Sequence, residues 1–548
     1  MIQEKFLTDL EVSIKNNWDS PAISNYEGET LNYGQLADKI LWLHSIFEKF
    51  NIKKNDKIAV IGKNSVNWAI VYLATISYGA VIVPILSDFK ADDVQHIVNH
   101  SDTKLLFAAN SIFENLDEVK MPNLDAIFKI EDCSIIYSKK NLKIDFLEKV
   151  KKDYLTKYNN GLTKNNFKIK EISNDDLATI VYTSGTTGFS KGVMLKHNSI
   201  SANIRYAQRN MPLKAGDKIV SFMPLAHCYG CAFEFLFPIS KGCHITFLEK
   251  IPSPKIIVKA FQEVRPQLIL SVPLVIEKIY KKQILPVISK TSIKIFMKLP
   301  LLSKKVHDKI RAKLMGAFGN NFHEVVIGGA ALNHEVENFF RKINFPFTNG
   351  YGMTECGPLI SYAGCKVNKP YSVGQVVDTL EIRVDSQNPQ NVVGEIWVRG
   401  ENVMEGYYKN VEATNKAIDR DGWLHTGDLG LIDKDGFIYL KGRCKDMLLS
   451  SSGQNIYPEE IESRLNNMKF ISESLVIDRG GKLVALVYPD FEAVDAEKIG
   501  EDELKNKMEE NLKVVNEMLP SYSKIIQIEI YPQEFEKTPT KKIKRYLY

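Results

Sequence analysis

Strand and helix patterns alternate along the first third of the chain. Asn32 and Gln35 have the spacing of a capping box, which predicts that a helix begins there. The apolar residues that follow share one helical face: Leu36, Ile40, Leu43, Ile46 and Phe47. Buried strands are predicted over residues 57–62 and 80–85, with a helix through 68–73 between them. Strand–helix–strand units of this kind predict an α/β fold whose mostly parallel sheet is covered by helices on both faces.

Strand patterns replace this alternation between residues 372 and 408. The segments VGQVV, LEIRV and EIWVRG follow one another there. They predict a small antiparallel, β-barrel-like subdomain at the end of a large domain of mixed and parallel sheets with helices. We place this large domain at residues 1–445.

A second, smaller domain is predicted after a boundary near Asp446. Its pattern consists of a helix over 458–465, a hairpin that turns at Gly480–Gly481, a helix over 501–519 and the strand IIQIEI, followed by a basic tail. About one hundred residues of α+β structure can fold as a separate unit. We therefore expect residues 446–548 to form a mobile domain, which we call the lid.

Length and composition narrow the class of protein. The chain of 548 residues exceeds one ordinary domain, and 44% hydrophobic residues suffice for real cores. The net charge of +5 is small for this length and argues against a nucleic-acid binder. The N-terminus has no apolar core of signal-peptide length, and no apolar run approaches the roughly 20 residues that span a bilayer. With seven scattered cysteines, these features favour a cytoplasmic protein with reduced thiols.

One group of cysteines and histidines has spacing that suggests a metal site. His227, Cys228, Cys231, Cys243 and His244 include a C-x-x-C pair, so zinc is conceivable. The surrounding sequence, LAHCYGCAFEFLFPISKGCHITF, is strongly apolar and is typical of a core helix followed by a strand. Since small cysteines are commonly buried in cores, we favour the structural interpretation.

A basic segment interrupts the α/β pattern over residues 278–314. Lysines alternate there with Ile, Phe, Leu and Met, as in KTSIKIFMKLPLLSKKVHDKIRAKL. One interpretation is a helical arm whose charges are solvated. The alternative is a patch that contacts a membrane surface and collects lipid substrates.

The strongest chemical signal is the sequence IVYTSGTTGFSKGVML, at residues 180–195. An apolar strand leads into residues suited to hold an anion through backbone N–H groups, hydroxyls and an ammonium: Thr183, Ser184, Gly185, Thr186, Thr187, Gly188 and Lys191. It is not a Walker A loop, because Ser190 and Gly192 flank the lysine. It is not a dinucleotide fingerprint either, because a threonine occupies the place of the first glycine.

This string resembles the signature of the adenylate-forming (AMP-binding) family, which includes acyl-CoA synthetases, luciferase-like enzymes and the adenylation domains of peptide synthetases. The chain departs from the signature at Ser190, where the family usually has proline. Five further motifs follow in the family's order, and the resemblance extends from about Tyr33 to Arg545. Long-chain fatty acid–CoA ligases are the most similar branch.

The resemblance implies roles for two loops in the middle of the chain. VIGGAAL and NGYGMTECGP resemble loops that line adenine, and Tyr351 would stack on the base. Thr354 would contact the α-phosphate and Glu355 would hold Mg²⁺. The other residues implied as nucleotide contacts are Gly328, Gly329, Ala330, Asn349, Gly352 and Met353.

The remaining motifs imply the ribose, the acid and the lid contacts. Asp428 in GWLHTGDLG would accept hydrogen bonds from both ribose hydroxyls, and Arg443 would be a second contact. In FMPLAHCYG, His227 would lie beside the substrate carboxylate. In the tail EKTPTKKIKRYLY, Lys542 aligns with the family's catalytic lysine, although lysine replaces the glycine before it. Gly453 would lie near the channel for the pantetheine arm of coenzyme A.

These motifs together imply an acid–thiol ligase. ATP and Mg²⁺ would activate a carboxylic acid, expected to be a medium- or long-chain fatty acid, as its acyl-adenylate, with release of pyrophosphate. Coenzyme A would then take the acyl group as a thioester. One alternative keeps the adenylation chemistry but acylates a carrier protein. Another is a non-catalytic nucleotide- or lipid-binding relative, which would be expected to lack Glu355, Asp428 or Lys542.

Overall fold

The computed structural model describes most of the chain. The described residues are 3–140, 145–159, 161–183, 190–249, 253–288, 290–291, 293, 295, 300–449, 454–538 and 542–548. Two of the predicted segments, 184–188 and 450–453, lie outside them.

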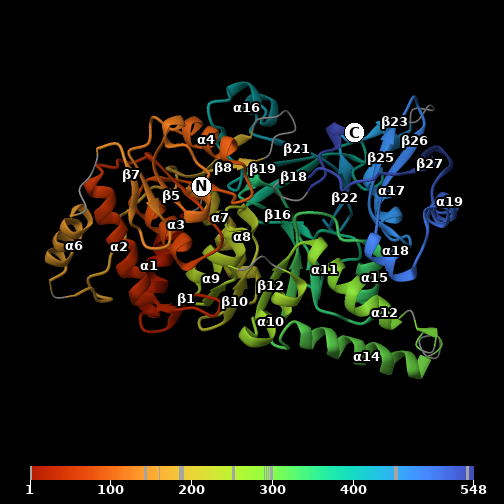
Figure 1. Cartoon of the computed structure of the whole chain (residues 1–548), viewed down its shortest axis with the longest axis horizontal. Coiled ribbons are helices and arrows are strands. Elements are labelled where there is room, and N and C mark those ends of the chain that lie inside the picture. Colours follow the sequence, from red (N-terminus) through yellow and green to blue (C-terminus); the bar gives the residue numbers. More distant parts are fainter. Residues whose placement is uncertain are drawn as a thin grey trace.

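A large, mostly parallel sheet forms the centre of the first domain (Figure 1). Its strands, in spatial order, are β20 (Gly406–Tyr407), β9 (Lys191–Lys196), β8 (Leu177–Thr183), β4 (Val81–Ile85), β3 (Lys57–Ile61), β5 (Thr103–Ala108), β6 (Ala126–Lys129) and β7 (Ile135–Ser138). The strands from β8 to β6 run parallel, whereas β7, β9 and β20 pair antiparallel at the edges. The predicted buried strands and the parallel sheet are therefore confirmed.

The predicted capping box at the start of the second helix is also present. The Asn32 side chain accepts from the Gln35 backbone N–H, and the Gln35 side chain accepts from the Asn32 N–H. Satisfying these N–H groups stabilises the first turn of α2 (Tyr33–Lys49). The apolar face of α2 is buried, as its spacing predicted.

Two further sheets of the large domain lie beside the central one. The first contains β10 (Lys218–Ser221), β11 (His244–Phe247), β1 (Pro21–Asn25) and β2 (Thr30–Asn32); the second contains β12 (Leu268–Ser271), β13 (Glu324–Ile327) and β14 (Phe347–Asn349). The second is wholly parallel, so the carboxyl ends of its strands meet at one edge. A short sheet of β15 (Tyr351–Gly352), β16 (Leu359–Tyr362) and β17 (Gln375–Val376) follows.

The predicted β-barrel-like subdomain is an open antiparallel sheet in the part of the chain that is described. It contains β18 (Leu380–Asp385), β19 (Gly394–Gly400), β21 (Leu424–Ile432) and β22 (Ile438–Arg443). Its two edge strands do not pair with each other, because four strands are too few to close around a filled interior. The segment VGQVV contributes to β17 in the neighbouring short sheet instead.

The lid has its own sheet and its own apolar cluster. Its elements are β23 (Leu448–Leu449), β24 (Asn455–Ile456), α17 (Pro458–Leu465), β25 (Ile471–Asp478), β26 (Leu483–Pro489), α18 (Phe491–Glu497), α19 (Glu501–Glu517) and β27 (Ile525–Ile530). The cluster around Leu465, Ala485 and Val515 is built from lid residues alone. The predicted helices, hairpin and final strand are present, with α19 ending two residues before the predicted Leu519.

Helices cover the sheets of the large domain. They are α1 (Phe6–Asn16), α3 (Val66–Tyr78), α4 (Ala91–His100), α5 (Asn110–Phe113), α6 (Phe146–Lys157), α7 (His197–Asn210), α8 (Cys228–Gly230), α9 (Phe237–Ser240), α10 (Pro254–Val264), α11 (Pro273–Ile279), α12 (Leu285–Ile288), α14 (Pro300–Ala317), α15 (His334–Lys342) and α16 (Val411–Ala417). Two π-helical segments, η2 (Cys231–Leu236) and η3 (Tyr280–Ile284), continue α8 and α11. Among the described residues, no helix has the length and apolar content needed to cross a bilayer.

The lid contacts the large domain through the basic segment. Lys281 donates to the backbone oxygen of Asn466 at 3.1 Å, and Lys282 pairs with Glu492 at 3.2 Å. Figure 1 shows the lid at the end of the molecule opposite α6, beside α11 and α15. Part of the predicted basic arm therefore serves as the surface against which the lid rests.

Candidate active site

The two ends of the phosphate-loop motif lie opposite each other in the central sheet. Thr183 ends β8 and Lys191 begins β9, and the antiparallel register pairs them. The loop residues between them, Ser184, Gly185, Thr186, Thr187 and Gly188, lie outside the described part of the chain. Strand β20 pairs with β9 and brings Tyr407 next to Lys191, whose Nζ lies 4.8 Å from the centre of the Tyr407 ring. The lysine therefore has a defined position at the edge of the loop.

The predicted metal ligand Glu355 lies beside the same tyrosine. It belongs to η4 (Thr354–Cys356), a short turn after β15, and its Oε1 accepts a hydrogen bond from the Tyr407 hydroxyl at 2.8 Å. Burial and the neighbouring carboxylate raise the pKa of Tyr407, so the phenol stays protonated as a donor. Sequence reasoning missed Tyr407, because its role depends on the pairing of β20 with β9.

The predicted ribose acid lies in a group with two other predicted residues. Asp428 and Arg443 are partners in the register of β21 and β22, and the Arg443 Nε lies 3.1 Å from Asp428 Oδ1. The Tyr351 hydroxyl donates to Asp428 Oδ2 at 2.7 Å. Burial, and then the charge of Asp428, raise the pKa of Tyr351. An ionised carboxylate has about four lone-pair positions, so Asp428 can still accept two vicinal hydroxyls.

The two predicted adenine loops follow adjacent parallel strands. Gly328 follows β13, Asn349 ends β14, and Gly350 N–H donates to the Ile327 oxygen at 2.9 Å. A Cβ on Gly352 would lie 2.1 Å from the Pro358 oxygen, so only glycine fits there. The remaining predicted residues of the two loops are Gly329 and Ala330, which are exposed, and Met353, which is half-buried. These loops meet at one sheet edge, where ligands commonly bind.

His227 is half-buried and lies at the start of α8. Its Nδ1 accepts the backbone N–H of Tyr229 at 3.3 Å, which assigns the ring proton to Nε2. Burial, and then the positive charge of Lys542, lower the pKa of His227 to about 4. The ring is therefore neutral at pH 7 and presents a donor rather than a charge.

Lys542 reaches this region from the lid. It lies in a short hairpin in which the Thr538 N–H donates to the Lys542 oxygen at 2.8 Å and Lys537 pairs with Ile543. The side chain is exposed, and its charge acts on both His227 and Lys445. Lys541, the departure from the family pattern, lies outside the described residues. The hairpin therefore carries Lys542 on the side of the lid that faces the large domain.

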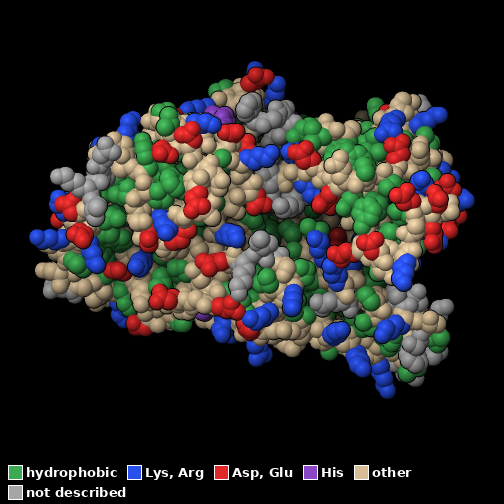
Figure 2. Space-filling view, viewed as in Figure 1, with side chains coloured by type: hydrophobic (Ala, Val, Ile, Leu, Met, Phe, Trp, Pro, Cys, Tyr) green, Lys and Arg blue, Asp and Glu red, His purple; other side chains and the backbone are tan. Residues whose placement is uncertain are grey.

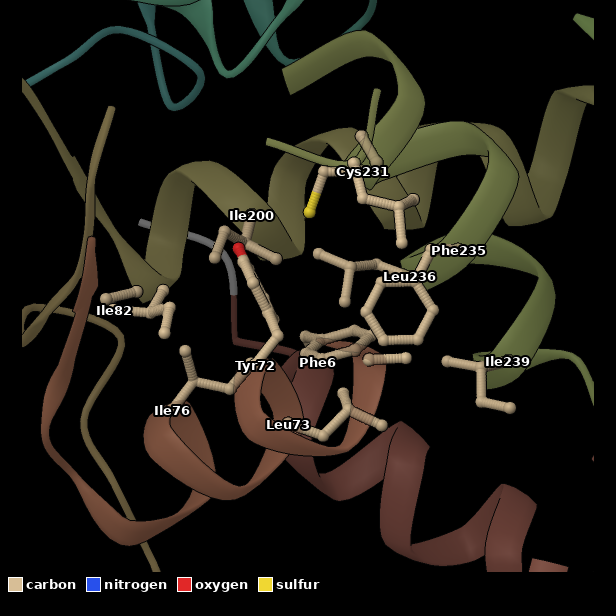
Figure 3. Packing of buried hydrophobic residues seen from close by; sticks show 14 of the residues in the cluster. Phe6, Tyr72, Leu73, Ile76, Ile82, Ile200, Cys231, Phe235, Leu236 and Ile239 are labelled. Atoms are coloured by element: carbon tan, nitrogen blue, oxygen red, sulfur yellow. The ribbon is translucent and has the colours of Figure 1, made fainter. Parts of the chain in front are cut away.

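An apolar cavity adjoins these residues inside the large domain. Its volume is about 20 Å³, and its lining includes Tyr72, Ile200, Cys228, Cys231, Leu236 and Gly357. Figure 3 shows the Tyr72 hydroxyl pointing between Ile200 and Cys231. Burial is the main cause that raises the pKa of Cys228, whose thiol also contacts the Thr354 side chain. One wall of the cavity is therefore shared with the Thr354–Glu355 turn.

The apolar segment 232–237 is divided between two environments. Ala232 and Leu236 line the cavity, whereas Phe233, Phe235 and Phe237 are fully buried in the core. The cysteines of the C-x-x-C pair are buried in the same core, as the structural interpretation predicted. The helix here is π-helical, a form that occurs often at functional sites.

Two family models match the chain, and both describe AMP-binding enzymes. Residues 10–408 match the family model of AMP-binding enzymes, and residues 445–547 match that of the AMP-binding enzyme C-terminal domain. A long-chain-fatty-acid–CoA ligase, ACSBG2 of Rattus norvegicus, is 28% identical over 513 residues, which cover 85% of this chain and 74% of the relative. A chloroplastic long-chain-fatty-acid–[acyl-carrier-protein] ligase of Arabidopsis thaliana, AEE15, is 28% identical over 533 residues, covering 84% and 72%.

Solved structures share the fold over nearly the whole chain. An anthranilate CoA ligase in complex with anthranoyl-AMP superposes with a TM-score of 0.78 at 17% sequence identity, and the match covers 99% of this chain and 96% of the other. At that identity the likeness establishes the fold alone. The family model, by contrast, covers most of the sequence and includes the loop ends, the adenine loops and Glu355. The chain therefore belongs to the AMP-binding enzyme family.

Proposed function

We propose that this protein is an acid–thiol ligase that activates a fatty acid with ATP and transfers the acyl group to coenzyme A. The observation that carries the proposal is the arrangement of Asp428, Tyr351 and Arg443 near Glu355, with Lys542 of the lid acting on His227. These side chains come from five separate segments of the chain. Their assembly in one place supports a site for a nucleotide beside a carboxylate.

Glu355 fits the demands of a magnesium ligand. Its carboxylate is half-buried, and the Tyr407 hydroxyl binds only Oε1, so lone pairs on the other oxygen point away from that bond. Mg²⁺ held there would neutralise charge on the phosphates of ATP. Thr183 and Lys191, at the ends of the phosphate loop, would contact the same phosphates together with the residues between them.

In the first step, a carboxylate oxygen of the acid attacks the α-phosphorus of ATP, and the bond from that phosphorus to pyrophosphate breaks. Two anions must approach each other, so fixed donors and positive charge around the phosphates lower the barrier. Lys542 is the cation placed to act there. His227 would donate from Nε2 to the acid, since its low pKa keeps the ring neutral.

In the second step, the sulfur of coenzyme A attacks the acyl carbon, and AMP leaves with the electrons of the mixed anhydride bond. We propose that residues 446–548 rotate about Asp446 between the steps, so that Gly453 replaces Lys542 beside the substrate. The contacts between lid and large domain support a mobile lid. They include the exposed pairs Lys282–Glu492 and Lys441–Glu460, at 3.2 and 3.1 Å, and such pairs contribute only about 0–1 kcal/mol each.

The apolar cavity supports a fatty acid as the substrate. Its lining includes Tyr72 together with Cys228 and Gly357, which lie next to the turn that carries Thr354. An acid whose carboxylate reached His227 could extend its tail toward this cavity. A cavity of about 20 Å³ holds roughly one water, so a long chain requires Tyr72 or Leu236 to move.

A pyrophosphate-release assay tests the proposal. Purified protein is given Mg²⁺, ATP and saturated acids from acetate to stearate, first without and then with coenzyme A. Without coenzyme A we expect pyrophosphate and acyl-adenylate, and with coenzyme A we expect AMP and thioester in equal amounts, in both cases most with medium or long chains. Absence of pyrophosphate with every acid would refute the proposal.

Acylation of a carrier protein is a second candidate for the final step. The relative named as an acyl-carrier-protein ligase supports it, because its identity to this chain equals that of the CoA ligase. The two acceptors require the same first step, so pyrophosphate release does not separate them. Supplying holo carrier protein in place of coenzyme A separates the two acceptors. We expect coenzyme A to be the better one.

We also propose that the helix α14 contacts an anionic membrane surface. Five exposed cations and one exposed acid lie along it: Lys304, Lys305, Lys309, Arg311 and Lys313, with Asp308. Figure 2 shows blue side chains along the lower edge of the molecule, where Figure 1 places α14. Leu302 is exposed on the same helix and could insert between headgroups. Each basic residue near such a surface contributes about 1 kcal/mol.

Vesicle cosedimentation tests this contact. We expect binding to phosphatidylglycerol vesicles, little binding to phosphatidylcholine vesicles, and release by about 0.5 M salt. The substitutions Lys305→Glu and Lys309→Glu together should abolish binding. The matched control, Lys505→Glu with Lys513→Glu on the acid-rich helix α19, should leave binding unchanged. Equal binding by both double variants would contradict the proposal.

A further inference from the structure

The strand that carries Asp428 is interrupted where it pairs with β19. Glu395 pairs with Leu429, and Trp397 pairs with His425. Between these two pairs β19 has one residue and β21 has three. Thr426, Gly427 and Asp428 therefore bulge out of the ladder. Bulges of this kind re-aim side chains next to active sites. Here Asp428 leaves the pairing with β19, and its carboxylate contacts Tyr351 and Arg443, which is its partner on β22.

The bulge frees a backbone N–H group that the ladder would otherwise bind. Glu395 Oε1 accepts the N–H of Gly427 at 2.9 Å, directly before Asp428. Glu395 Oε2 accepts the indole N–H of Trp397 at 2.9 Å, and His425 Nδ1 lies 3.9 Å from the same oxygen. The Glu395 side chain is mostly buried, with 23% of its surface exposed. One carboxylate therefore joins the Gly427 N–H of the bulge to the Trp397 indole N–H, with His425 beside it.

The rest of the bulge is also held by specific contacts. Thr426 Oγ1 donates to the Ile396 oxygen at 2.7 Å and accepts the Asp428 N–H at 3.0 Å. Gly427 has φ of +70°, a conformation that favours glycine. The Trp397 ring stacks on His425 with centroids 3.9 Å apart, and the Arg383 guanidinium covers its other face at 4.2 Å. The ring is thus fixed on both faces, so its N–H has little freedom to leave Glu395.

We propose that Glu395 is a positioning residue for ribose recognition, acting through the Gly427 N–H and the Trp397 indole to fix the direction of Asp428. This rests on the proposed function, in which Asp428 accepts the ribose hydroxyls of ATP. The contacts of Glu395 are with Gly427 and Trp397, so we assign it no direct contact with the nucleotide. Its loss should therefore weaken the recognition of the hydroxyls specifically, rather than the binding of phosphate or acid.

Nucleotide analogues that lack one hydroxyl test this role. Dissociation constants for ATP and 3′-deoxyATP are measured by calorimetry, and kcat and KM are measured for pyrophosphate release. Wild-type protein should prefer ATP, and Asp428→Asn should remove that preference. Glu395→Gln keeps the size of the side chain but can accept only one of the two N–H groups. We expect its preference for ATP to fall about tenfold, through KM more than kcat.

Two further variants separate positioning from general stability. Trp397→Phe keeps the stacked ring and removes only the indole N–H, so the preference should fall by a smaller factor; this variant decides the question if Glu395→Gln does not fold. Glu381→Gln is the control, because Glu381 pairs with Arg399 at 2.8 Å on the same sheet, outside the bulge. Its preference should equal that of the wild type.

The possible failures have different meanings. If Glu395→Gln and Trp397→Phe discriminate like the wild type while Asp428→Asn does not, Glu395 has no role in ribose recognition and the proposed function stands. If wild-type protein binds ATP and 3′-deoxyATP equally, Asp428 does not read ribose, and the role of Glu395 is refuted with it.

Discussion

Replacing Lys542 with alanine should separate the two half-reactions. The lysine lies on the lid, in the hairpin closed by the Lys537–Ile543 bridge, and its charge acts on the half-buried ring of His227. Among the described residues, Lys542 is the charged side chain that lowers the pKa of His227, after burial. Truncation at Lys542 therefore removes the lid cation that acts beside the proposed carboxylate position, and leaves the hairpin backbone in place.

The size of the effect follows from Coulomb's law. A cation about 4 Å from a phosphate oxygen contributes roughly 4 kcal/mol at an effective dielectric constant near 20, and roughly 1 kcal/mol in bulk water. Lys542 is exposed in the structure, but bound substrates would displace water around it. If the interaction strengthens only in the transition state, the upper figure corresponds to about three decades in rate. We therefore expect acyl-adenylate formation to fall by about 10²–10³.

Single-turnover assays measure the two steps separately. Pyrophosphate release from ATP and fatty acid reports the first step, and thioester formation from supplied acyl-adenylate and coenzyme A reports the second. Lys544→Ala is the matched control, because Lys544 lies two residues away and pairs with Glu536 at 2.6 Å. The control should retain both rates. Equal losses in the two steps for Lys542→Ala would refute its assignment to adenylation.

Three other predictions concern the proposed hinge, the Glu355 carboxylate and two buried histidines. Asp446→Pro should preserve pyrophosphate release and stall thioester synthesis, because proline fixes the backbone at the proposed hinge; normal steady-state thioester synthesis would contradict this. Tyr407→Phe should raise the Mg²⁺ concentration needed for nucleotide binding by calorimetry about tenfold, since one donor to Glu355 is lost, whereas Tyr408→Phe should not. Burial lowers the pKa of His44 and His197 to about 4, so the unfolded state binds more protons between about pH 4 and 6.5. The free energy of unfolding should therefore be highest above pH 6.5 and should fall by up to about 3 kcal/mol for each histidine as the pH falls toward 4. Equal urea midpoints at pH 7 and 4.5 would contradict this.

The parts of the fold that local pattern determines were predictable from the sequence. The capping box at Asn32 and Gln35, the buried strands β3 and β4, and the helix α17 depend on short-range spacing and apolar periodicity. The sheet that contains β18 and β21 was expected to be barrel-like and is open instead. Whether a set of antiparallel strands closes depends on strand number and stagger, which the pattern of one strand does not contain.

The candidate site was predictable only in its motif residues. Tyr351, Asp428 and Arg443 stand in recognisable strings, and the structure brings them into contact. Tyr407 and Glu395 were missed, because each acts on a partner through strand pairing. Tyr407 meets Glu355 only because β20 pairs with β9, about two hundred residues earlier in the chain. The string GEIW at 394–397 predicts only a strand, since a bulge in the partner strand leaves no periodic signal.

The contacts within the lid and the contacts between the lid and the large domain differ in strength, and this difference affects how the lid would move. Within the lid, Arg545 pairs with the buried carboxylate of Glu462. Burial raises the pKa of Glu462 to about 7. Removing one partner of a buried pair costs about 3–5 kcal/mol of stability. The contacts of Lys281 and Lys282 with the lid lie at the exposed surface and contribute far less. The contact that fixes the end of the Lys542 hairpin to the lid is therefore stronger than these two surface contacts between the lid and the large domain. Any force that withdraws Lys542 from the site should move the whole lid before it detaches the hairpin, so that removing the lysine and presenting the region around Gly453 become a single motion.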